Sequence, residues 1–361
     1  MKKNFLVLFL TLIFLGCSKQ KKVNLFFLDE YVVKDSLLFQ NSVLGGFSGI
    51  ALSSKDNYYL IVDDAKKPRF LESSIVIQDD KIQSVIFKNV TFLKDSVSSF
   101  YQENHLDLES VFIDIENQEI NLVSEGFINE NKKPLIFITD LKGNYKYQYP
   151  LPAQFLDLQN IKHNAVFEAS SKSTDKKGFW IAMEGVLKPD GEEPTFAKTA
   201  SPIRITFFDK KNKEATKQFA YQLEHITKPA KGNINLNGVT AILEYKENHF
   251  FVIERTYQSG YGAYGNIVRI FEAFIDKKTT NILENDALKK VNYIPLKKRL
   301  LFNFEAVKNQ LTDGIIDNIE GITFGPKLAN GNQSLILVSD DNFQIYGKQL
   351  NQFILLEIDE N

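Results

Sequence analysis

The sequence predicts an all-β protein, a β-propeller with five visible blade repeats and room for a sixth. First, most segments after residue 23 are apolar runs of four to eight residues, rich in Ile, Val, Phe and Tyr, as in folds built from many short strands. Second, one pattern recurs five times: a pair of apolar runs whose second run ends in acid, with a further acid near the start of the first run in three of the copies. Third, the 361 residues contain no linker-like stretch, so we expect residues 24–361 to form a single domain.

Composition agrees with this class and argues against some functions. The chain contains 30 Phe and 14 Tyr, and aromatic residues favour strands. Hydrophobic residues make up 43% and charged residues 24%, as in globular proteins with a sizeable core. The formal net charge of −2 argues against nucleic acid as a partner, because nucleic-acid binders usually carry a basic excess.

The N-terminal residues predict export and a lipid anchor. Met1-Lys2-Lys3 is basic, an apolar run covers residues 5–14, and Leu15-Gly16-Cys17 follows, which is the order of a signal peptide. Cys17 directly after Leu-Gly resembles a bacterial lipobox, so we expect residues 1–16 to be removed, Cys17 to carry lipid and residues 17–23 to form a tether. Ser18 is similar to the sorting signal of outer-membrane lipoproteins and implies a site facing the periplasm. An ordinary signal peptide with an incidental cysteine is the alternative.

Cys17 is the only cysteine. An exported chain with one cysteine cannot form an internal disulfide, and small exported domains often depend on such bonds. Packing or metal must therefore hold this fold together.

The repeats can be followed in chain order as pairs of apolar runs. The pairs occupy residues 47–52 with 58–64, 108–113 with 120–126, 167–169 with 178–185, 237–242 with 249–255, and 317–323 with 335–342. Two further runs follow the second pair, at residues 134–139 and 145–151, which makes four strands, one propeller blade. Only residues 352–358 follow the last pair, so we expect residues 23–33 to supply the strand that completes this blade and closes the ring. The interval between Glu254 and Glu320 leaves room for a sixth blade.

The acidic residues of the repeats are expected to meet at one end of the propeller. The first strand of a blade lines the central channel and the second pairs with it antiparallel, so the start of one lies beside the end of the other. Three repeats carry acid at both places, as Glu109 with Glu125, Glu168 with Glu184, and Glu320 with Asp340. The first and fourth repeats carry acid only after the second run, as Asp63-Asp64 and Glu254.

This convergence predicts a metal site. Neighbouring carboxylates repel by about 1 kcal/mol per close pair even in water, so the cluster needs cations, protons or arginines. Carboxylate oxygens suit Ca²⁺ first and Mg²⁺ or Mn²⁺ next. We therefore predict Ca²⁺ as cofactor, with the ligands Asp63, Asp64, Glu109, Glu125, Glu320, Asp340 and Asp341. The alternative is that these acids are solvated turn residues, but turns favour Asp, Asn or Gly, whereas Glu is the commonest residue at these positions.

Two arginines lie beside the acids in the sequence. Arg255 follows Glu254 directly, and Arg69 follows Asp63-Asp64 by one turn. The guanidinium fork suits bidentate binding of phosphate or of carboxylate. The two arginines therefore either hold a substrate phosphate or pair with the neighbouring acids.

Taken together, these motifs resemble the bacterial "esterase-like activity of phytase" family, the phytase-like domain, from Gly45 to Ile358. The matching pieces are residues 45–50 with 62–64 and Arg69, 107–109 with 124–126, 167–168 with 183–184, 237–238 with 253–255, and 318–322 with 338–343. The resemblance implies a β-propeller and the hydrolysis of phosphate esters. The family tends to have Gly after the first-strand acid, where this chain has Ser110 and Ala169.

The sequence leaves three functions open. We favour a lipid-anchored, Ca²⁺-dependent phosphoesterase of the cell envelope, a monomer that acts on a small phosphorylated substrate. In this function a carboxylate without metal takes the proton of the attacking water, Arg69 and Arg255 hold phosphate oxygens, and the catalytic carboxylates are Glu168, Glu184 and Glu254. The second function is a propeller glycosidase that uses two or three of the carboxylates as acid, base or nucleophile, although Trp180 is the only tryptophan for stacking sugars. The third is a non-catalytic envelope module stabilised by Ca²⁺.

Overall fold

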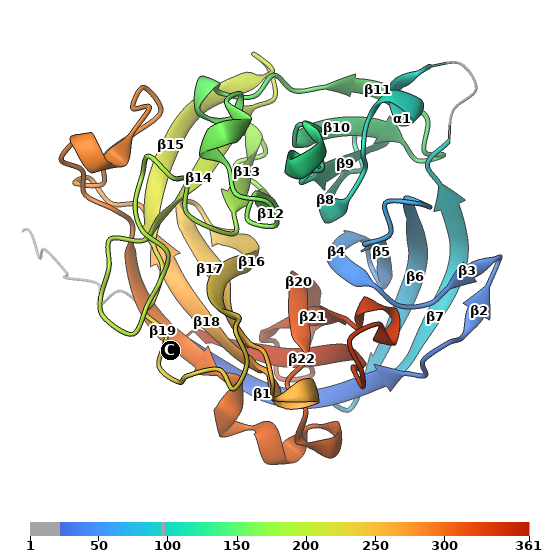
Figure 1. The fold of residues 1–361 in the computed structure, drawn as a ribbon. Coiled ribbons are helices and arrows are strands. Elements are labelled where there is room, and N and C mark those ends of the chain that lie inside the picture. The colour runs from blue at the N-terminus through green and yellow to red at the C-terminus, as the bar shows by residue number, and fades with distance from the viewer. Residues whose placement is uncertain (1–21, 95–97, 361) are drawn as a thin grey trace, which may run out of the picture.

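The protein is a five-bladed β-propeller, which confirms the predicted fold class. The computed structural model describes residues 22–94 and 98–360. Five four-stranded antiparallel sheets surround a central axis, with the first strands innermost (Figure 1). The predicted signal peptide and Cys17 lie outside the described residues. Within the described part of the chain, no helix has the length and apolarity needed to cross a membrane.

The blades follow one another along the chain, and their strands are named from the axis outward. Blade 1 consists of β4 (Phe47–Ser54), β5 (Asn57–Val62), β6 (Arg69–Gln78) and β7 (Lys81–Phe92). Blade 2 consists of β8 (Leu108–Asp114), β9 (Glu119–Ser124), β10 (Leu135–Asp140) and β11 (Tyr145–Gln148). Blade 3 consists of β12 (Phe167–Lys172), β13 (Gly178–Met183), β14 (Pro202–Asp209) and β15 (Glu214–Gln222). Blade 4 consists of β16 (Asn235–Lys246), β17 (His249–Gln258), β18 (Asn266–Phe274) and β19 (Lys297–Asn303). Blade 5 consists of β20 (Asn318–Lys327), β21 (Gln333–Asp340), β22 (Asn351–Glu360) and β1 (Val23–Val33).

The remaining elements are short. A small hairpin is formed by β2 (Leu38–Phe39) and β3 (Ser42–Val43), and the one α-helix of the described residues is α1 (Phe100–Glu103). Single 3₁₀ turns are η1 (Ile128–Glu130), η2 (Ala153–Phe155), η3 (Leu158–Asn160), η4 (Gly262–Tyr264), η5 (Leu288–Lys290), η6 (Phe304–Ala306), η7 (Lys308–Gln310), η8 (Thr312–Gly314) and η9 (Asn342–Gln344). The interval in which the sequence left room for a sixth blade holds β18, β19 and several of these turns instead.

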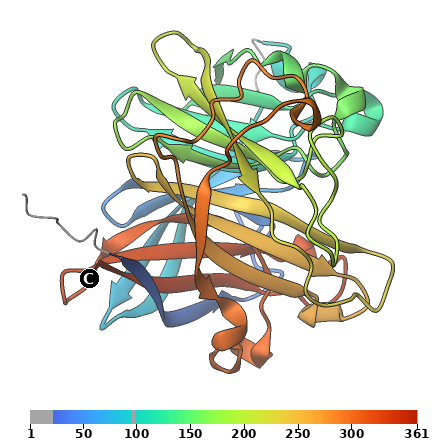
Figure 2. The same cartoon turned by 90° about the vertical axis from the view of Figure 1, so that its left-hand side faces the viewer.

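The N-terminal strand closes the ring, as predicted. β1 pairs antiparallel with β22, from Val23 beside Glu360 to Val33 beside Asn351. Asn351 lies at the end of the blade where the innermost strand begins, so Val23 and Glu360 lie at the opposite end. The end of the chain accordingly lies on the side away from the face seen in Figure 1 (Figure 2). We call the end of the channel where the innermost strands begin the mouth.

The core lies between neighbouring blades and is rich in aromatic side chains. Between blades 2 and 3, Tyr149 packs edge-on against Phe179 at a centroid distance of 4.9 Å, and within blade 3 the ring of Phe179 stacks on that of Phe208 at 5.3 Å. Between blades 3 and 4, Trp180 packs edge-on against Phe250 at 5.0 Å. Aromatic pairs in these arrangements add about 1 kcal/mol each beyond the burial of their area. The Phe-rich composition therefore serves blade-to-blade packing.

Each innermost strand carries a β-bulge near its start. The extra residue, which has no partner on the second strand, is Ser48, Glu109, Glu168, Thr240 or Glu320 in blades 1 to 5 respectively. A bulge bends its strand locally and re-aims the side chain of the extra residue. This recurrent irregularity positions the site described below.

The residue after each bulge is small, because the innermost strands crowd together around the axis. A Cβ atom on Gly321 would lie 3.0 Å from the backbone nitrogen of Ile50. Ser110 occupies the equivalent place in blade 2. Its hydroxyl pairs with that of Ser170 at 2.7 Å and accepts from the Ser170 backbone N–H at 2.8 Å. Ser110 therefore connects the innermost strand of blade 2 to that of blade 3 through hydrogen bonds to Ser170.

Candidate functional site

Two rings of equivalent side chains line the mouth, and the bulge residues form the first. This ring carries acid in blades 2, 3 and 5 (Glu109, Glu168 and Glu320) and a hydroxyl in blades 1 and 4 (Ser48 and Thr240). The hydroxyls tie the ring together. Ser48 donates to the carbonyl of Leu108 at 2.6 Å, and Thr240 donates to the carbonyl of Ile319 at 2.8 Å. Each accepting residue directly precedes the acid of the next blade.

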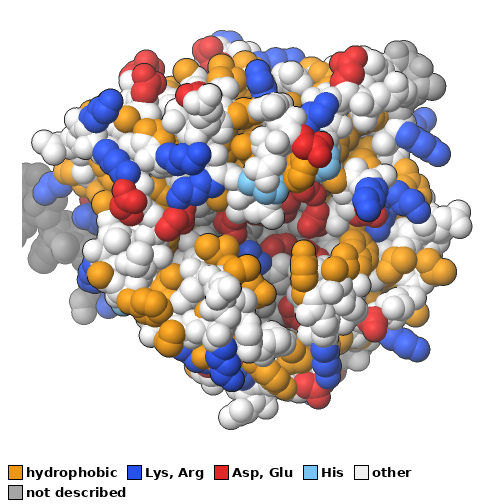
Figure 3. All heavy atoms as spheres, viewed as in Figure 1, with side chains coloured by type: hydrophobic (Ala, Val, Ile, Leu, Met, Phe, Trp, Pro, Cys, Tyr) orange, Lys and Arg blue, Asp and Glu red, His pale blue; other side chains and the backbone are white. Residues whose placement is uncertain are grey.

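The second ring comes from the second strands. In each blade, the residue just before the bulge pairs with a residue at the end of the second strand. The residue that follows this partner along the chain belongs to the second ring. The five members are Asp63, Glu125, Glu184, Arg255 and Asp340. The ring is acidic in four blades and basic in blade 4. On this face of the molecule, acidic side chains line a hollow at the centre (Figure 3).

Glu254 is not placed in the mouth, contrary to the expected convergence. It precedes Arg255 by one residue, and successive residues of a strand point to opposite faces. The carboxylate of Glu254 is fully buried and accepts hydrogen bonds from the Tyr221 hydroxyl at 2.6 Å and the Lys298 ammonium at 2.7 Å. The side-chain amide of Asn237 adds a third, at 2.8 Å. Glu254 therefore joins blades 3 and 4.

Arg69 and Asp64 are paired with each other at the rim. Arg69 is 2% exposed, and its guanidinium donates to the Asp64 carboxylate at 2.7 Å and to the Ser42 hydroxyl at 2.7 Å. The carbonyl of Lys67 accepts a further hydrogen bond at 2.8 Å. Of the two alternatives that the sequence left open for Arg69, the structure shows pairing with a neighbouring acid.

Asp341 fixes the junction between blades 5 and 1. Its carboxylate accepts from the backbone N–H of Gly46 at 2.8 Å and from the side-chain amide of Asn351 at 3.0 Å. A third donor, the backbone N–H of Phe343, lies at 3.2 Å. With its lone pairs used in this way, Asp341 is separate from the carboxylates that face one another in the mouth.

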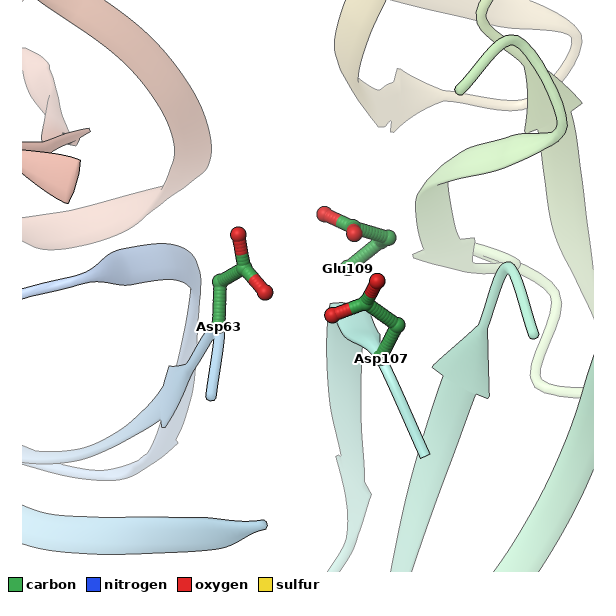
Figure 4. Close-up of side chains that lie close together, drawn as sticks. All are labelled: Asp63, Asp107 and Glu109. Carbon is green, nitrogen blue, oxygen red and sulfur yellow. The ribbon is translucent and has the colours of Figure 1, made fainter. Parts of the chain in front are cut away.

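Asp107 is a mouth residue that the prediction omitted from its ligands. It lies just before β8, and its carboxyl group shares a hydrogen bond with that of Asp63. Asp63, Asp107 and Glu109 each offer one oxygen, and these oxygens lie within 4.8 Å of one another. The three side chains point toward one another across the gap between blades 1 and 2 (Figure 4). The signal was present in the sequence, because residues two apart on an extended strand share a face.

A second group adjoins the first. Glu109, Glu125 and Glu168 also offer one oxygen each within 4.8 Å of one another. They are only 7%, 3% and 9% exposed, and no hydrogen-bond donor of the described residues reaches any of their carboxylates. One oxygen of Glu125, Oε2, is fully buried and without a partner. Buried charges are normally paired or bound to metal, so this group has the character of an ion-binding site.

The opposite side of the mouth is partly neutralised by arginine. The guanidinium of Arg255 donates to Glu184 at 3.2 Å and to Glu320 at 3.1 Å. The side-chain amide of Asn318 donates to the same oxygen of Glu320 at 2.7 Å. Among the described residues, Arg255 is the only arginine or lysine that pairs with the mouth carboxylates, which are Asp63, Asp107, Glu109, Glu125, Glu168, Glu184, Glu320 and Asp340.

Burial and mutual repulsion raise the pKa values of these acids. Burial is the largest cause, and neighbouring carboxylates add to it, at the five mouth groups whose pKa lies well above the usual range, Asp63, Glu109, Glu168, Glu320 and Asp340. Burial, followed by the charges of Glu184 and Asp63, raises the pKa of Glu125 to about 8. The mouth therefore needs protons or metal cations to balance its charge at neutral pH. Its oxygen-only donors and orphaned Glu125 oxygen fit a hard cation such as Ca²⁺.

Comparison with known families places this chain. The model of the phytase-like family, described as "Esterase-like activity of phytase", matches residues 42–343. The chain belongs to the phytase-like family. All eight mouth carboxylates of this phytase-like propeller lie within the matched residues, and the resemblance noted in the sequence is thereby confirmed. No match to a curated protein sequence was found.

Solved structures match most of this phytase-like chain at low sequence identity. A thermostable family-43 glycoside hydrolase is 12% identical, with 88% of this chain and 90% of that chain covered and a TM-score of 0.45. A putative glycoside hydrolase from Bacteroides ovatus is 11% identical, with 88% and 87% covered and a TM-score of 0.43. Hydrazine synthase from Kuenenia stuttgartiensis is 9% identical with a TM-score of 0.38, and the match covers 81% of this chain but only 64% of that one. These likenesses concern the fold alone.

Proposed function

We propose that this phytase-like propeller is a metal-dependent hydrolase of phosphoric esters, with Ca²⁺ as the first choice of ion. The observation that carries the proposal is the group of three buried carboxylates, Glu109, Glu125 and Glu168, which accept no hydrogen bond from the described residues. Holding such a group ionised in a protein interior is costly without a cation. The chain belongs to a family that is described by an esterase-like activity, and this membership supports a hydrolytic role.

The proposed ligands are the carboxylates that face one another across the mouth. They are Asp63, Asp107, Glu109, Glu125 and Glu168. When bound, Ca²⁺ would screen the charge of a substrate phosphate and lower the pKa of a water molecule that attacks it. Without this positive charge the acidic mouth would repel a phosphate ester.

Arg255 is the proposed phosphate anchor. It uses one N–H of each terminal nitrogen for Glu320 and Glu184, and its Nε has no partner. A guanidinium carries five N–H donors, so donors remain for phosphate oxygens. Glu184 and Glu320 hold the guanidinium in place. These contacts fix its orientation toward a phosphate but also reduce the positive charge that it offers to the phosphate.

Glu184 is the proposed acceptor of the proton from the attacking water. Burial raises its pKa, and the neighbouring Arg255 opposes this rise. A general base works best when its pKa lies near the operating pH. Only one of its two oxygens is engaged by Arg255, so the other is available to a water in the mouth. We do not extend the catalytic role to Glu254 or Arg69, because both are held in the structural contacts described above.

The test is hydrolysis of a phosphomonoester and a phosphodiester of p-nitrophenol, with Ca²⁺, with chelator, and with Ca²⁺ restored. Activity should appear with Ca²⁺, vanish with chelator and return. The Glu168→Gln variant should lose most of it, whereas Glu130→Gln, which removes an exposed acid near the rim, should not. No turnover with Ca²⁺, Mg²⁺ or Mn²⁺ would contradict the proposal. Hydrolysis of glycosides that survives chelation would favour a glycosidase instead.

We also propose that a lipid on Cys17 anchors the protein in the bacterial envelope, at the outer membrane facing the periplasm, as a monomer. The support is the lipobox-like sequence at Cys17 and the position of β1. Val23 lies at the end of blade 5 away from the mouth, so a short tether from Cys17 would leave the mouth open to solvent. Labelling of the wild type with radioactive palmitate, and its loss in Cys17→Ala, tests the anchor. Analytical ultracentrifugation of the soluble domain tests the monomer.

A further inference from the structure

The geometry points to two cation sites in the mouth, not one, with Glu109 as the ligand that they share. This inference rests on the proposed metal-dependent function and adds the number of ions and the role of each ligand. The first site uses Asp63, Asp107 and Glu109, and the second uses Glu109, Glu125 and Glu168.

Distance separates the two sites. Oxygens bound to one Ca²⁺ lie about 2.3–2.6 Å from the ion, so no two of them can be more than about 5 Å apart. Within each group of three residues, the oxygens lie within 4.8 Å of one another, so each group fits one ion. The two groups overlap only at Glu109. Asp63 and Glu168 therefore fall in different groups, each of which fits an ion of its own.

The sites also occupy different clefts of the propeller. Asp63 follows β5 in blade 1, whereas Asp107 and Glu109 belong to the start of β8 in blade 2, so the first site bridges blades 1 and 2 (Figure 4). Glu125 follows β9 in blade 2 and Glu168 begins β12 in blade 3, so the second site bridges blades 2 and 3. Blade 2 supplies ligands to both, because it alone combines a bulge acid, a second-ring acid and Asp107.

Glu109 is suited to the shared position. It is the bulge residue of β8, it is only 7% exposed, and no donor of the described residues occupies its oxygens. An ionised carboxylate has two oxygens with about four lone-pair sites, enough for one bond to each of two ions. The charge of the five ligands is −5, so one divalent ion leaves −3 and two leave −1. The second ion thus removes most of the repulsion that remains after the first.

Two ions that share a carboxylate fit the proposed reaction. In phosphatases and nucleases, ions about 3.5–4 Å apart supply positive charge to both the attacking and the leaving oxygen of the phosphoryl group. A glycosidase has no such requirement, because its acid and base must remain free of metal.

Ion stoichiometry tests this inference without a substrate. Calorimetric titration of the chelator-treated protein with Ca²⁺, checked by elemental analysis after dialysis, should give two ions per chain. Asp63→Asn should lose the first site and keep one ion, and Glu168→Gln should lose the second and keep one. Glu109→Gln should weaken both sites at least tenfold, and the control Glu130→Gln should keep two. One ion in the wild type, or loss of a single site in Glu109→Gln, would overturn the inference.

A spectroscopic measurement separates a shared ligand from two independent sites. Mn²⁺ ions joined by a carboxylate give an exchange-coupled paramagnetic resonance signal, whereas single ions give six lines. The wild type should show the coupled signal and Asp63→Asn, Glu109→Gln and Glu168→Gln should not. Circular dichroism in chelator shows that each variant is folded, which we expect because an amide relieves repulsion in the mouth. Two coupled ions without phosphoester hydrolysis would contradict the proposed function alone, and hydrolysis with one ion would contradict this inference alone.

Discussion

Replacing Glu125 by glutamine should stabilise the metal-free protein at alkaline pH. Glu125 has a pKa of about 8 in the folded protein against an ordinary 4.5. The folded state therefore binds this proton more tightly than the unfolded state does, and the stabilising effect of protonation is fully present below pH 4.5 and lost as the pH rises through 8. A glutamine cannot ionise, so it avoids the cost of placing a charge among the buried carboxylates.

The magnitude follows from proton linkage. Each unit of pKa shift corresponds to about 1.4 kcal/mol, so ionising Glu125 lowers the free energy of unfolding by about 4 kcal/mol at pH 8 but by only about 1 kcal/mol at pH 5. In chelator, Glu125→Gln should therefore exceed the wild type in stability by up to these amounts. With Ca²⁺ at one hundred times its dissociation constant, the wild type should gain about 2.7 kcal/mol that the variant, having lost a metal ligand, does not gain. This gain exceeds the advantage of about 1 kcal/mol at pH 5, so the order should reverse there, whereas at pH 8 it should only reduce the advantage of about 4 kcal/mol.

Urea denaturation followed by circular dichroism, at several pH values between 5 and 8 with chelator or with Ca²⁺, measures both effects. Glu130→Gln is the matched control, since it makes the same chemical change at an exposed rim position and should shift stability by less than about 0.5 kcal/mol. The reasoning fails if the advantage of Glu125→Gln in chelator does not grow with pH. It fails equally if Ca²⁺ stabilises the variant as much as the wild type.

Three further predictions concern residues outside the ion sites. Glu254→Ala should lower the free energy of unfolding by about 3–5 kcal/mol, because it removes the buried acceptor shared by the Tyr221 hydroxyl, the Asn237 amide and the Lys298 ammonium, while the folded fraction keeps its Ca²⁺ stoichiometry in a calorimetric titration; loss of one ion would instead place Glu254 among the ligands. Arg69→Lys should lower the melting temperature by several degrees without changing KM, because lysine cannot reproduce the fork that joins Asp64, Ser42 and Lys67; a large rise in KM would assign Arg69 to substrate binding. Deletion of residues 23–33 should prevent cooperative unfolding, because β22 would lose its partner along its whole length; a sharp, unchanged thermal transition would show that the ring does not need β1.

The sequence was sufficient for the blade order, the closing strand and most of the acidic mouth, because these depend on local patterns. The antiparallel pairing of the first two strands of each blade, together with the symmetry of the ring, placed Asp63, Glu125, Glu184 and Asp340 correctly in one ring. In blade 4 the same approach chose Glu254, whereas the structure puts Arg255 at the equivalent position. The sequence took Gly238 as the counterpart of the first-strand acids, whereas the bulge of β16 falls at Thr240. Val239, which precedes the bulge, pairs with Glu254, so Arg255 is the residue that turns into the mouth, because successive residues of a strand point to opposite faces.

Two adjacent acids illustrate a second limit of sequence analysis. Asp63-Asp64 and Asp340-Asp341 each looked like a pair of ligands. In both pairs only the first acid faces the mouth. The second acid has another partner, because Arg69 donates a hydrogen bond to Asp64 and the backbone N–H of Gly46 donates one to Asp341. Gly46 is 295 residues away from Asp341 in the sequence, and such a contact becomes visible only when blade 5 meets blade 1. Long-range partners decide which of two neighbouring acids remains free, and no local pattern contains them.

In the proposed function, the departure from five-fold symmetry at blade 4 would make the mouth suitable for an anionic substrate. If both rings of the mouth were acidic in all five blades, cations would be attracted equally to every blade. Carboxylates that had bound no ion would then still repel a phosphate. Blade 4 supplies Thr240 and Arg255 where blades 2 and 3 supply two acids each. Arg255 also neutralises Glu184 and Glu320 beside it, which leaves the unpaired carboxylates gathered at blades 1 to 3. In the proposed function, a phosphate between the two sides would have metal ions on one side and guanidinium donors on the other, which neither side alone provides.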